Sequence, residues 1–288
     1  MKKITMTILL VTMIGSMVSC GNNTSTPAST EIEESAAVTS TTNEPAIVYA
    51  DAEFIESLKI GLQNRWDISE KDKEILKEND GVYPDVQTMK ESYSKCVNAE
   101  LEQLAEYPSR QFEDTKLQGS AIAYINILND SLACIDKYLP ADEFEFGEEW
   151  DKIYSQRSKA IKEFVNTYGL TVDEQYQSTL DDFLSTASYV EEKEDKEGEV
   201  QQLVNSIEFE LKKDDYGYKT YSAVVENTTG ISFEYMNLEI NLLDEDGVIV
   251  ESTYSSVENF NSGSKARFEF DTMEEFETYE IVADWKEK

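Results

Sequence analysis

The spacing of the hydrophobic residues changes once along the chain, and this change limits the folds available to it. From about residue 50 to 192, apolar residues recur every three or four positions, as in the series Phe54, Leu58, Leu62 and Trp66, which puts them on one face of an α-helix. From about residue 205 to 288, apolar and polar residues alternate, which is typical of half-buried β-strands. We therefore predict an α+β multidomain chain in which a helical part precedes a β part.

The helical part, residues 50 to 192, is predicted to hold about five helices. The first four carry apolar stripes over about residues 54–66, 86–104, 117–139 and 150–168, and the stop signals of the second, third and fourth are Pro108, Pro140 and Gly169. Thr171 followed three residues later by Glu174 predicts a capping box that opens the fifth, with apolar residues from 176 to 187. Because each helix has a single apolar stripe, the helices have to cover one another, and we expect a bundle.

The β part, residues 205 to 288, is predicted to hold about six or seven short strands. Turn signals stand at NTTG (227–230), DEDG (244–247) and NSGS (261–264), between runs that include 207–211, 219–226 and 236–242. This pattern favours a small immunoglobulin-like antiparallel β-sandwich. Residues 193 to 204, which are rich in Glu and Lys, are predicted to be an acidic linker, as a hinge or a helical spacer.

The N-terminus predicts export. Lys2 and Lys3 precede an apolar run of signal-peptide length, so residues 1–19 are interpreted as a signal peptide. The motif Met17-Val18-Ser19-Cys20 resembles a bacterial lipobox, although Met17 stands where Leu is usual, and this resemblance implies a lipid-modified Cys20. An ordinary cleaved secretory signal is the alternative. Residues 20–49, rich in Ser and Thr, are predicted to be a disordered tether.

Charge and composition exclude several classes of function. Asp and Glu number 59 against 25 Lys and Arg, and the chain has no histidine. The negative charge disfavours nucleic acid as a partner, and the missing imidazole excludes His-based triads and His-ligated zinc. No cofactor and no dedicated metal site is predicted.

Two cysteines remain after Cys20, namely Cys96 and Cys134, both in predicted helices. Export places them in a compartment where a disulfide can persist. The sequence leaves two alternatives open: a disulfide between neighbouring helices, or two small buried core residues.

Candidate catalytic motifs are weak. Ser92 with Lys95 and Ser262 with Lys265 match the S-x-x-K pattern of serine acyl-enzymes, but the companion motifs are missing. Acidic residues cluster from 142 to 151, and Glu148 and Glu149 could serve a carboxylate-dependent hydrolase. A solvated interhelical loop is the simpler interpretation of this cluster.

The segment from 226 to 270 is similar to the FxLYD domain of bacterial surface lipoproteins. Its motif is Ile240-Asn241-Leu242-Leu243-Asp244, with aliphatic residues at the aromatic positions, followed by a DG turn and an SG pair before a Phe-rich strand. The preceding helical part is similar to uncharacterised regions of lipoproteins from Gram-positive bacteria. The resemblance implies a sandwich fold and a surface location, and it implies no catalytic residues.

These features together predict a non-enzymatic lipoprotein, anchored through Cys20 to the extracytoplasmic face of a bacterial membrane. We expect it to act as a binding module for a protein, peptide or envelope ligand. A carboxylate-dependent hydrolase of cell-envelope polymers is the alternative.

Replacement of Cys20 with Ala tests the anchor. Fatty chains gain about 0.8 kcal/mol for each buried methylene, so we expect the wild type in the membrane fraction and Cys20→Ala in the soluble or secreted fraction. Fractionation with immunoblotting measures the shift. Equal membrane retention of both forms would contradict lipidation.

Overall fold

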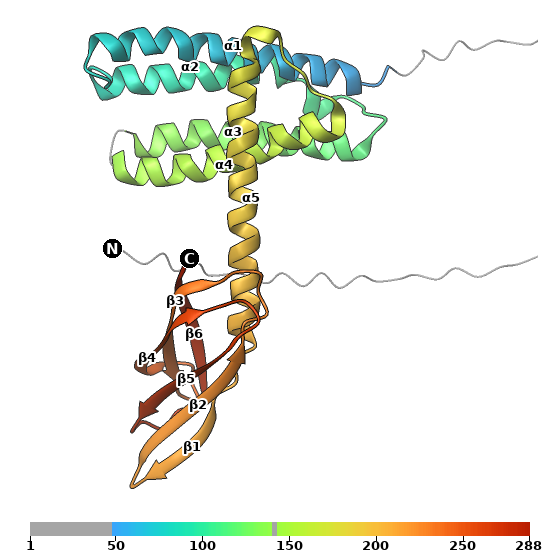
Figure 1. Cartoon of the computed structure of the whole chain (residues 1–288). Helices are drawn as coiled ribbons and strands as arrows, with labels where there is room; N and C mark the ends of the chain where they lie inside the picture. The colour runs from blue at the N-terminus through green and yellow to red at the C-terminus, as the bar shows by residue number, and fades with distance from the viewer. Residues whose placement is uncertain (1–47, 140–142) are drawn as a thin grey trace, which may run out of the picture. The chain divides into compact units, whose positions relative to one another are not determined.

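The computed structural model describes residues 48–139 and 143–288, and the predicted signal peptide, Cys20 and nearly all of the tether lie outside them. The α+β class is confirmed: five α-helices come first, and two three-stranded antiparallel sheets follow (Figure 1). The helices are α1 (Asp51–Glu78), α2 (Val86–Leu104), α3 (Thr115–Tyr138), α4 (Glu143–Tyr168) and α5 (Gln177–Asn205). Within the described residues, none of these helices combines the length and the apolarity needed to cross a bilayer.

The predicted apolar stripes form the helical core. Phe54, Leu58 and Leu62 are fully buried, and they belong to one cluster with residues of α2, α3, α4 and α5. The Asp85 carboxylate caps α2 by accepting a hydrogen bond from the Thr88 amide, and Asp114 caps α3. Gly169 ends α4 with a φ of 72°, a conformation in which a Cβ atom would be strained. Local signals and tertiary packing therefore agree over most of the bundle.

The predicted capping box at Thr171 is wrong. Residues 171–173 belong to no helix, and the backbone of Asp173 is extended; a short 3-10 helix η2 (Glu174–Tyr176) follows, and α5 begins at Gln177. Asp173 instead binds α1: its carboxylate pairs with Lys59 at 2.8 Å, and its amide donates to Gln63 Oε1 at 2.9 Å. These contacts hold the chain extended where the local motif favours a helix.

The interpretation of the acidic segment 142–151 as a solvated interhelical loop is also wrong for the residues that the structure describes. Within its described residues, helix α4 already begins at Glu143. The reason is the spacing of two aromatic residues: Phe146 and Trp150 stack at 5.5 Å, one turn apart, and Phe146 is buried in the helical core.

The β part is a sandwich of two sheets, with strand orders β1-β2-β5 and β4-β3-β6. Strand β3 is central in its sheet, and its alternate residues Met236, Leu238, Ile240 and Leu242 are fully buried, as the period of two predicts. The strands are β1 (Glu210–Asp215), β2 (Tyr218–Glu226), β3 (Phe233–Leu243), β4 (Ile249–Phe260), β5 (Lys265–Thr272) and β6 (Thr278–Glu287). All pairings are antiparallel.

The first strand starts later than residues 207–211 predict. Ile207 is buried in the sandwich core, and the Phe209 amide donates to the Tyr279 hydroxyl, so neither residue is part of the sheet. The side chains of Ile207 and Phe209 pack with the sandwich core, and pairing with β2 begins at Glu210.

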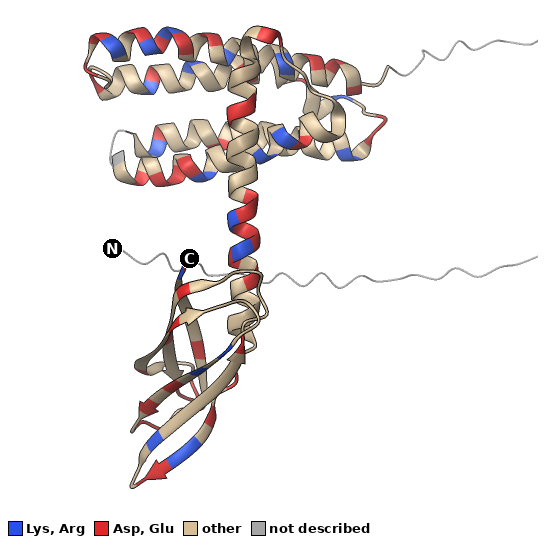
Figure 2. Cartoon of the chain, viewed as in Figure 1, with Lys and Arg blue, Asp and Glu red and all other residues tan. Residues whose placement is uncertain are grey.

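Residues 193–204, predicted to be a linker, lie inside helix α5. Figure 2 shows acidic and basic residues following one another along this stretch, and Lys196 pairs with Glu192 at 2.9 Å and with Glu287 of β6 at 2.7 Å. Val200, Leu203 and Val204 then enter the core of the sandwich. The same helix therefore contributes to both hydrophobic cores.

The predicted NTTG turn is organised by a buried asparagine. Asn227 is 1% exposed, and its amide nitrogen donates to the carbonyl oxygens of Ile231 and Phe260. Its side-chain oxygen accepts hydrogen bonds from the amide and the hydroxyl of Thr229. One side chain thus ties the β2–β3 connection to the end of β4.

Replacement of Asn227 with Ala should destabilise the sandwich by at least about 2 kcal/mol, because buried backbone groups lose their partners. Thr228, an exposed residue of the same turn, provides the control. Urea unfolding monitored through Trp285 fluorescence, in chains whose other two tryptophans are replaced with Phe, measures both. An equal effect of Asn227→Ala and Thr228→Ala would refute the assigned role.

Candidate functional site

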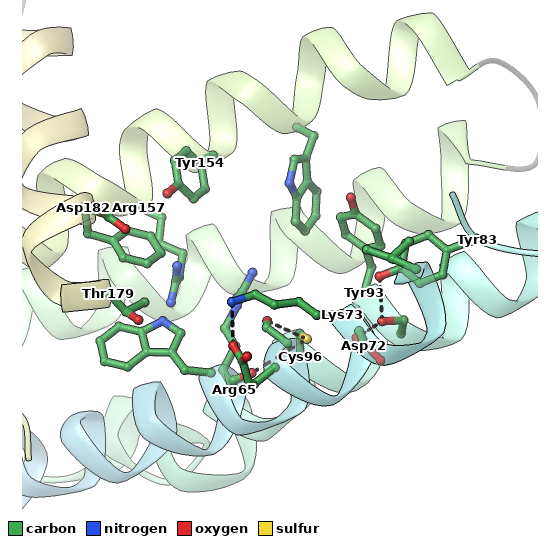
Figure 3. Close-up of a pocket in the computed structure, with 17 residues that line it drawn as sticks. Arg65, Asp72, Lys73, Tyr83, Tyr93, Cys96, Tyr154, Arg157, Thr179 and Asp182 are labelled. Carbon is green, nitrogen blue, oxygen red and sulfur yellow. Dashed lines mark hydrogen bonds and ion pairs between the residues drawn. The ribbon is translucent and has the colours of Figure 1, made fainter. Parts of the chain in front are cut away.

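A cleft of about 410 Å³ lies between helices of the bundle (Figure 3). Residues of α1, α2, α4 and α5 line it together with Tyr83, which precedes α2. Its aromatic lining consists of Trp66, Tyr83, Tyr93, Trp150, Tyr154 and Phe183. Aromatic side chains with a few convergent polar groups are the usual composition of a small-ligand site.

The buried end of the cleft contains two arginines bound to one glutamate. Glu100 of α2 is fully buried, and its Oε1 accepts hydrogen bonds from Arg65 Nη1 at 2.8 Å and from Arg157 Nη2 at 2.7 Å. The Tyr124 hydroxyl of α3 donates to the other oxygen, Oε2. This group of four side chains, which we call the Glu100 cluster, joins α1, α2, α3 and α4.

A glycine allows the close approach that the Glu100 cluster requires. A Cβ atom on Gly61 of α1 would lie 3.1 Å from the Cα atom of Glu100. Arg65 follows Gly61 by four residues and so lies on the same face of α1. The absence of a side chain at Gly61 therefore brings α1 close enough for Arg65 to reach the carboxylate.

The cluster keeps its charges despite burial. Burial alone would raise the pKa of Glu100, but the positive charges of Arg157 and Arg65 hold this pKa below its usual value. Burial likewise opposes the charge of Arg157, but Glu100 and Tyr124 together outweigh this effect and raise the pKa of Arg157. Burial also raises the pKa of Tyr124, which stays protonated and donates to Glu100.

The charges of the cluster do not cancel. Two guanidinium groups face one carboxylate, so one positive charge remains in a buried environment. Among the residues that the structure describes, Arg157 Nε, Arg157 Nη1 and Trp66 Nε1 find no hydrogen-bond acceptor, although all three are buried. The Arg157 guanidinium also lies over the Phe183 ring at 4.8 Å. A buried donor without a partner is costly, so this end of the cleft favours an anionic ligand group.

The rim of the cleft is more exposed and more acidic. Glu70, Asp72 and Asp182 line it with one lysine, Lys73, which pairs with Glu70 at 2.5 Å. The side chains of Glu70 and Lys73 are 71% and 69% exposed, whereas Arg157 is 1% exposed. Asp72 accepts a hydrogen bond from Ser92, which also bonds to the Tyr83 hydroxyl at 3.1 Å. The cleft is thus positive at its buried end and negative at its rim.

The structure separates most of the residues singled out from the sequence. Cys20 lies outside the described residues. Cys96 and Cys134 are free, buried thiols, and the Cys96 thiol lies in the cleft, 3.5 Å from the Ser69 hydroxyl. Burial raises the pKa of both cysteines.

The S-x-x-K pairs are not assembled as catalytic pairs. Ser92 lines the cleft, but Lys95 is exposed. Ser262 donates to the Thr229 carbonyl, and Lys265 pairs with Glu226.

The acidic candidates are on the surface of α4. Glu148 is exposed, and Glu149 pairs with Lys152 at 2.5 Å. No group of three or more Cys, Asp or Glu side chains in the described part of the chain is arranged to hold a metal ion.

The sequence interpretation missed the Glu100 cluster, although a signal for it exists. Arg65 stands between the stripe residues Leu62 and Trp66, and Arg157 lies four residues from both Ile153 and Ile161. Glu100 likewise follows Val97 by three residues. Charged residues of opposite sign on apolar faces indicate a buried ion pair, because a lone buried charge is rarely stable.

Comparisons with known proteins add no assignment. No protein-family model and no curated protein matches the chain. Among solved structures, an alkylpurine DNA glycosylase, AlkC of Pseudomonas fluorescens bound to DNA containing an abasic site analog, aligns at 8% identity. The alignment covers 79% of this chain and 76% of that chain with a TM-score of 0.16. So low a score supports no conclusion about fold or function.

The cluster predicts unequal effects of removing its members. Glu100→Gln leaves two buried cations without a counter-charge and should cost about 3–5 kcal/mol of unfolding free energy. Arg157→Met leaves the neutral Arg65–Glu100 pair and should cost clearly less. Denaturant unfolding measures both, with the exposed Lys73→Met as a control that should change stability by about 0–1 kcal/mol. A larger loss for Arg157→Met than for Glu100→Gln would contradict the charge assignment.

Proposed function

We propose that the chain is a lipid-anchored protein of the extracytoplasmic membrane face that acts as a non-catalytic binding module. In this proposal the cleft of the helical bundle is the binding site for an envelope or extracellular ligand. The observation that carries it is the pair of unpartnered, buried donors on Arg157 at the end of an aromatic-lined cleft.

The construction of the cleft supports binding. Its walls come from four helices that share one hydrophobic core, and this supports a site that is largely formed before a ligand arrives. Preformed sites lose less conformational entropy on binding. The signal peptide and lipobox-like motif supply the proposed location, and the tether would hold the module away from the bilayer surface.

The sandwich is proposed as a second part of the same surface protein. Its similarity to the FxLYD domain in the DG turn and the Phe-rich strand supports this assignment.

The hydrolase alternative lacks a comparable observation. Glu149 is engaged by Lys152, and Glu148 lies on the exposed surface of α4. Neither carboxylate lines the cleft.

Two tryptophan substitutions on α5 test the cleft as a binding site. Thr179 lines the cleft, whereas the neighbouring Ser178 is exposed and does not line it. Thr179→Trp should fill the cleft, and Ser178→Trp should leave it open. Fractions of envelope and culture-medium extract are screened for a rise in melting temperature of the full mature chain. We expect active fractions to stabilise the wild type and Ser178→Trp but not Thr179→Trp.

Recovery of the bound compound tests the absence of catalysis. Mass spectrometry should find the stabilising compound unchanged after long incubation with the protein. Stabilisation of both tryptophan variants alike, or no active fraction, would refute the cleft as the site. Conversion of the compound would instead support an enzyme.

A further inference from the structure

We infer that the cleft binds a short peptide, with its free carboxylate at the Glu100 cluster and its free ammonium group at the acidic rim. This inference rests on the proposed function and gives its ligand a chemical class. Two opposite charges on one small molecule match the two ends of the cleft.

The carboxylate is matched by the buried end. The net charge of the Glu100 cluster is one positive unit, and Arg157 Nε, Arg157 Nη1 and Trp66 Nε1 each hold a proton without an acceptor. A carboxylate offers several lone pairs, enough to accept from more than one of these donors. Its charge would also balance the second arginine, because charge-assisted hydrogen bonds to guanidinium are strong in a desolvated site.

The ammonium group is matched by the rim. Glu70, Asp72 and Asp182 outnumber Lys73 there, and the whole chain carries a formal net charge of −34. Such a field repels a purely anionic ligand before it reaches the buried arginines. A ligand that is neutral overall avoids this repulsion and gains from both ends of the cleft.

The body of the ligand is matched by the walls. Trp150, Tyr93 and Phe183 offer flat apolar surfaces between the two charged ends. A cleft of about 410 Å³ is within the usual range for small-molecule sites. An inorganic anion such as phosphate would leave these walls uncovered, so a compound with an organic side chain fits better.

A panel of dipeptides and tripeptides with free termini tests the inference on the full mature chain. Trp66 and Trp150 are two of only three tryptophans, and both line the cleft, so intrinsic fluorescence reports occupancy. We expect saturable changes with some members. The C-terminal amide and the N-acetyl form of the best member should each bind at least about tenfold more weakly, because each loses a charged contact.

Two variants locate the carboxylate. Arg157→Met keeps the Arg65–Glu100 pair and should bind the free peptide at least about tenfold more weakly, with no remaining preference over the amide. Trp66→Phe keeps a six-membered aromatic ring but removes the indole N–H together with the five-membered ring, so it should weaken binding several-fold. Fluorescence from Trp150 remains available in both variants, and Trp285→Phe in the sandwich is the matched control that should leave affinity unchanged.

The outcomes separate this inference from the proposed function. If extract fractions stabilise Ser178→Trp but not Thr179→Trp, and no panel member binds, the inference is overturned. The proposal of a binding module then still stands. Equal affinity for the amide and the free acid would overturn it as well. If Arg157→Met does not fold, Trp66→Phe and the amide comparison in the wild type still decide the matter.

Discussion

The helical part is built around a carboxylate that two arginines share. Glu100 has no contact with solvent, and Arg65, Arg157 and Tyr124 bring the helices α1, α4 and α3 to it. A charge buried in this way tolerates little displacement, because loss of the Glu100 carboxylate leaves two buried guanidinium groups without a counter-charge. The apolar stripes around it hold the helices together, while the Glu100 cluster sets how α1, α3 and α4 are placed against α2.

In the proposed function, the same cluster links packing to binding. A single carboxylate is sufficient to pair one arginine, so the second leaves positive charge and free donors at the end of the cleft. Replacing such a group with apolar residues often keeps or raises stability. In the proposed function, two buried arginines with one glutamate are therefore better explained by a ligand than by stability alone. The aromatic walls and acidic rim then restrict which ligand fits.

Helix α5 connects the two hydrophobic cores. Leu180 and Phe183 pack in the helical core, and Val200, Leu203 and Val204 pack in the sandwich. The charged stretch between them carries ion pairs along the helix, which support helical structure without burial. These ion pairs explain why a segment without regularly spaced apolar residues still forms an uninterrupted helix.

The sequence by itself determined the fold class, most helices, the alternation of β3 and the turns, because these follow from hydrophobic period and from local Gly, Pro and Asp signals. Only the tertiary structure decided where α5 begins, since Asp173 is held by Lys59 and Gln63 of distant α1. The cleft also depends on the tertiary structure. Glu100 lies 35 positions from Arg65 and 57 positions from Arg157 in the sequence. Such distant partners meet only through helix packing, which no local pattern encodes.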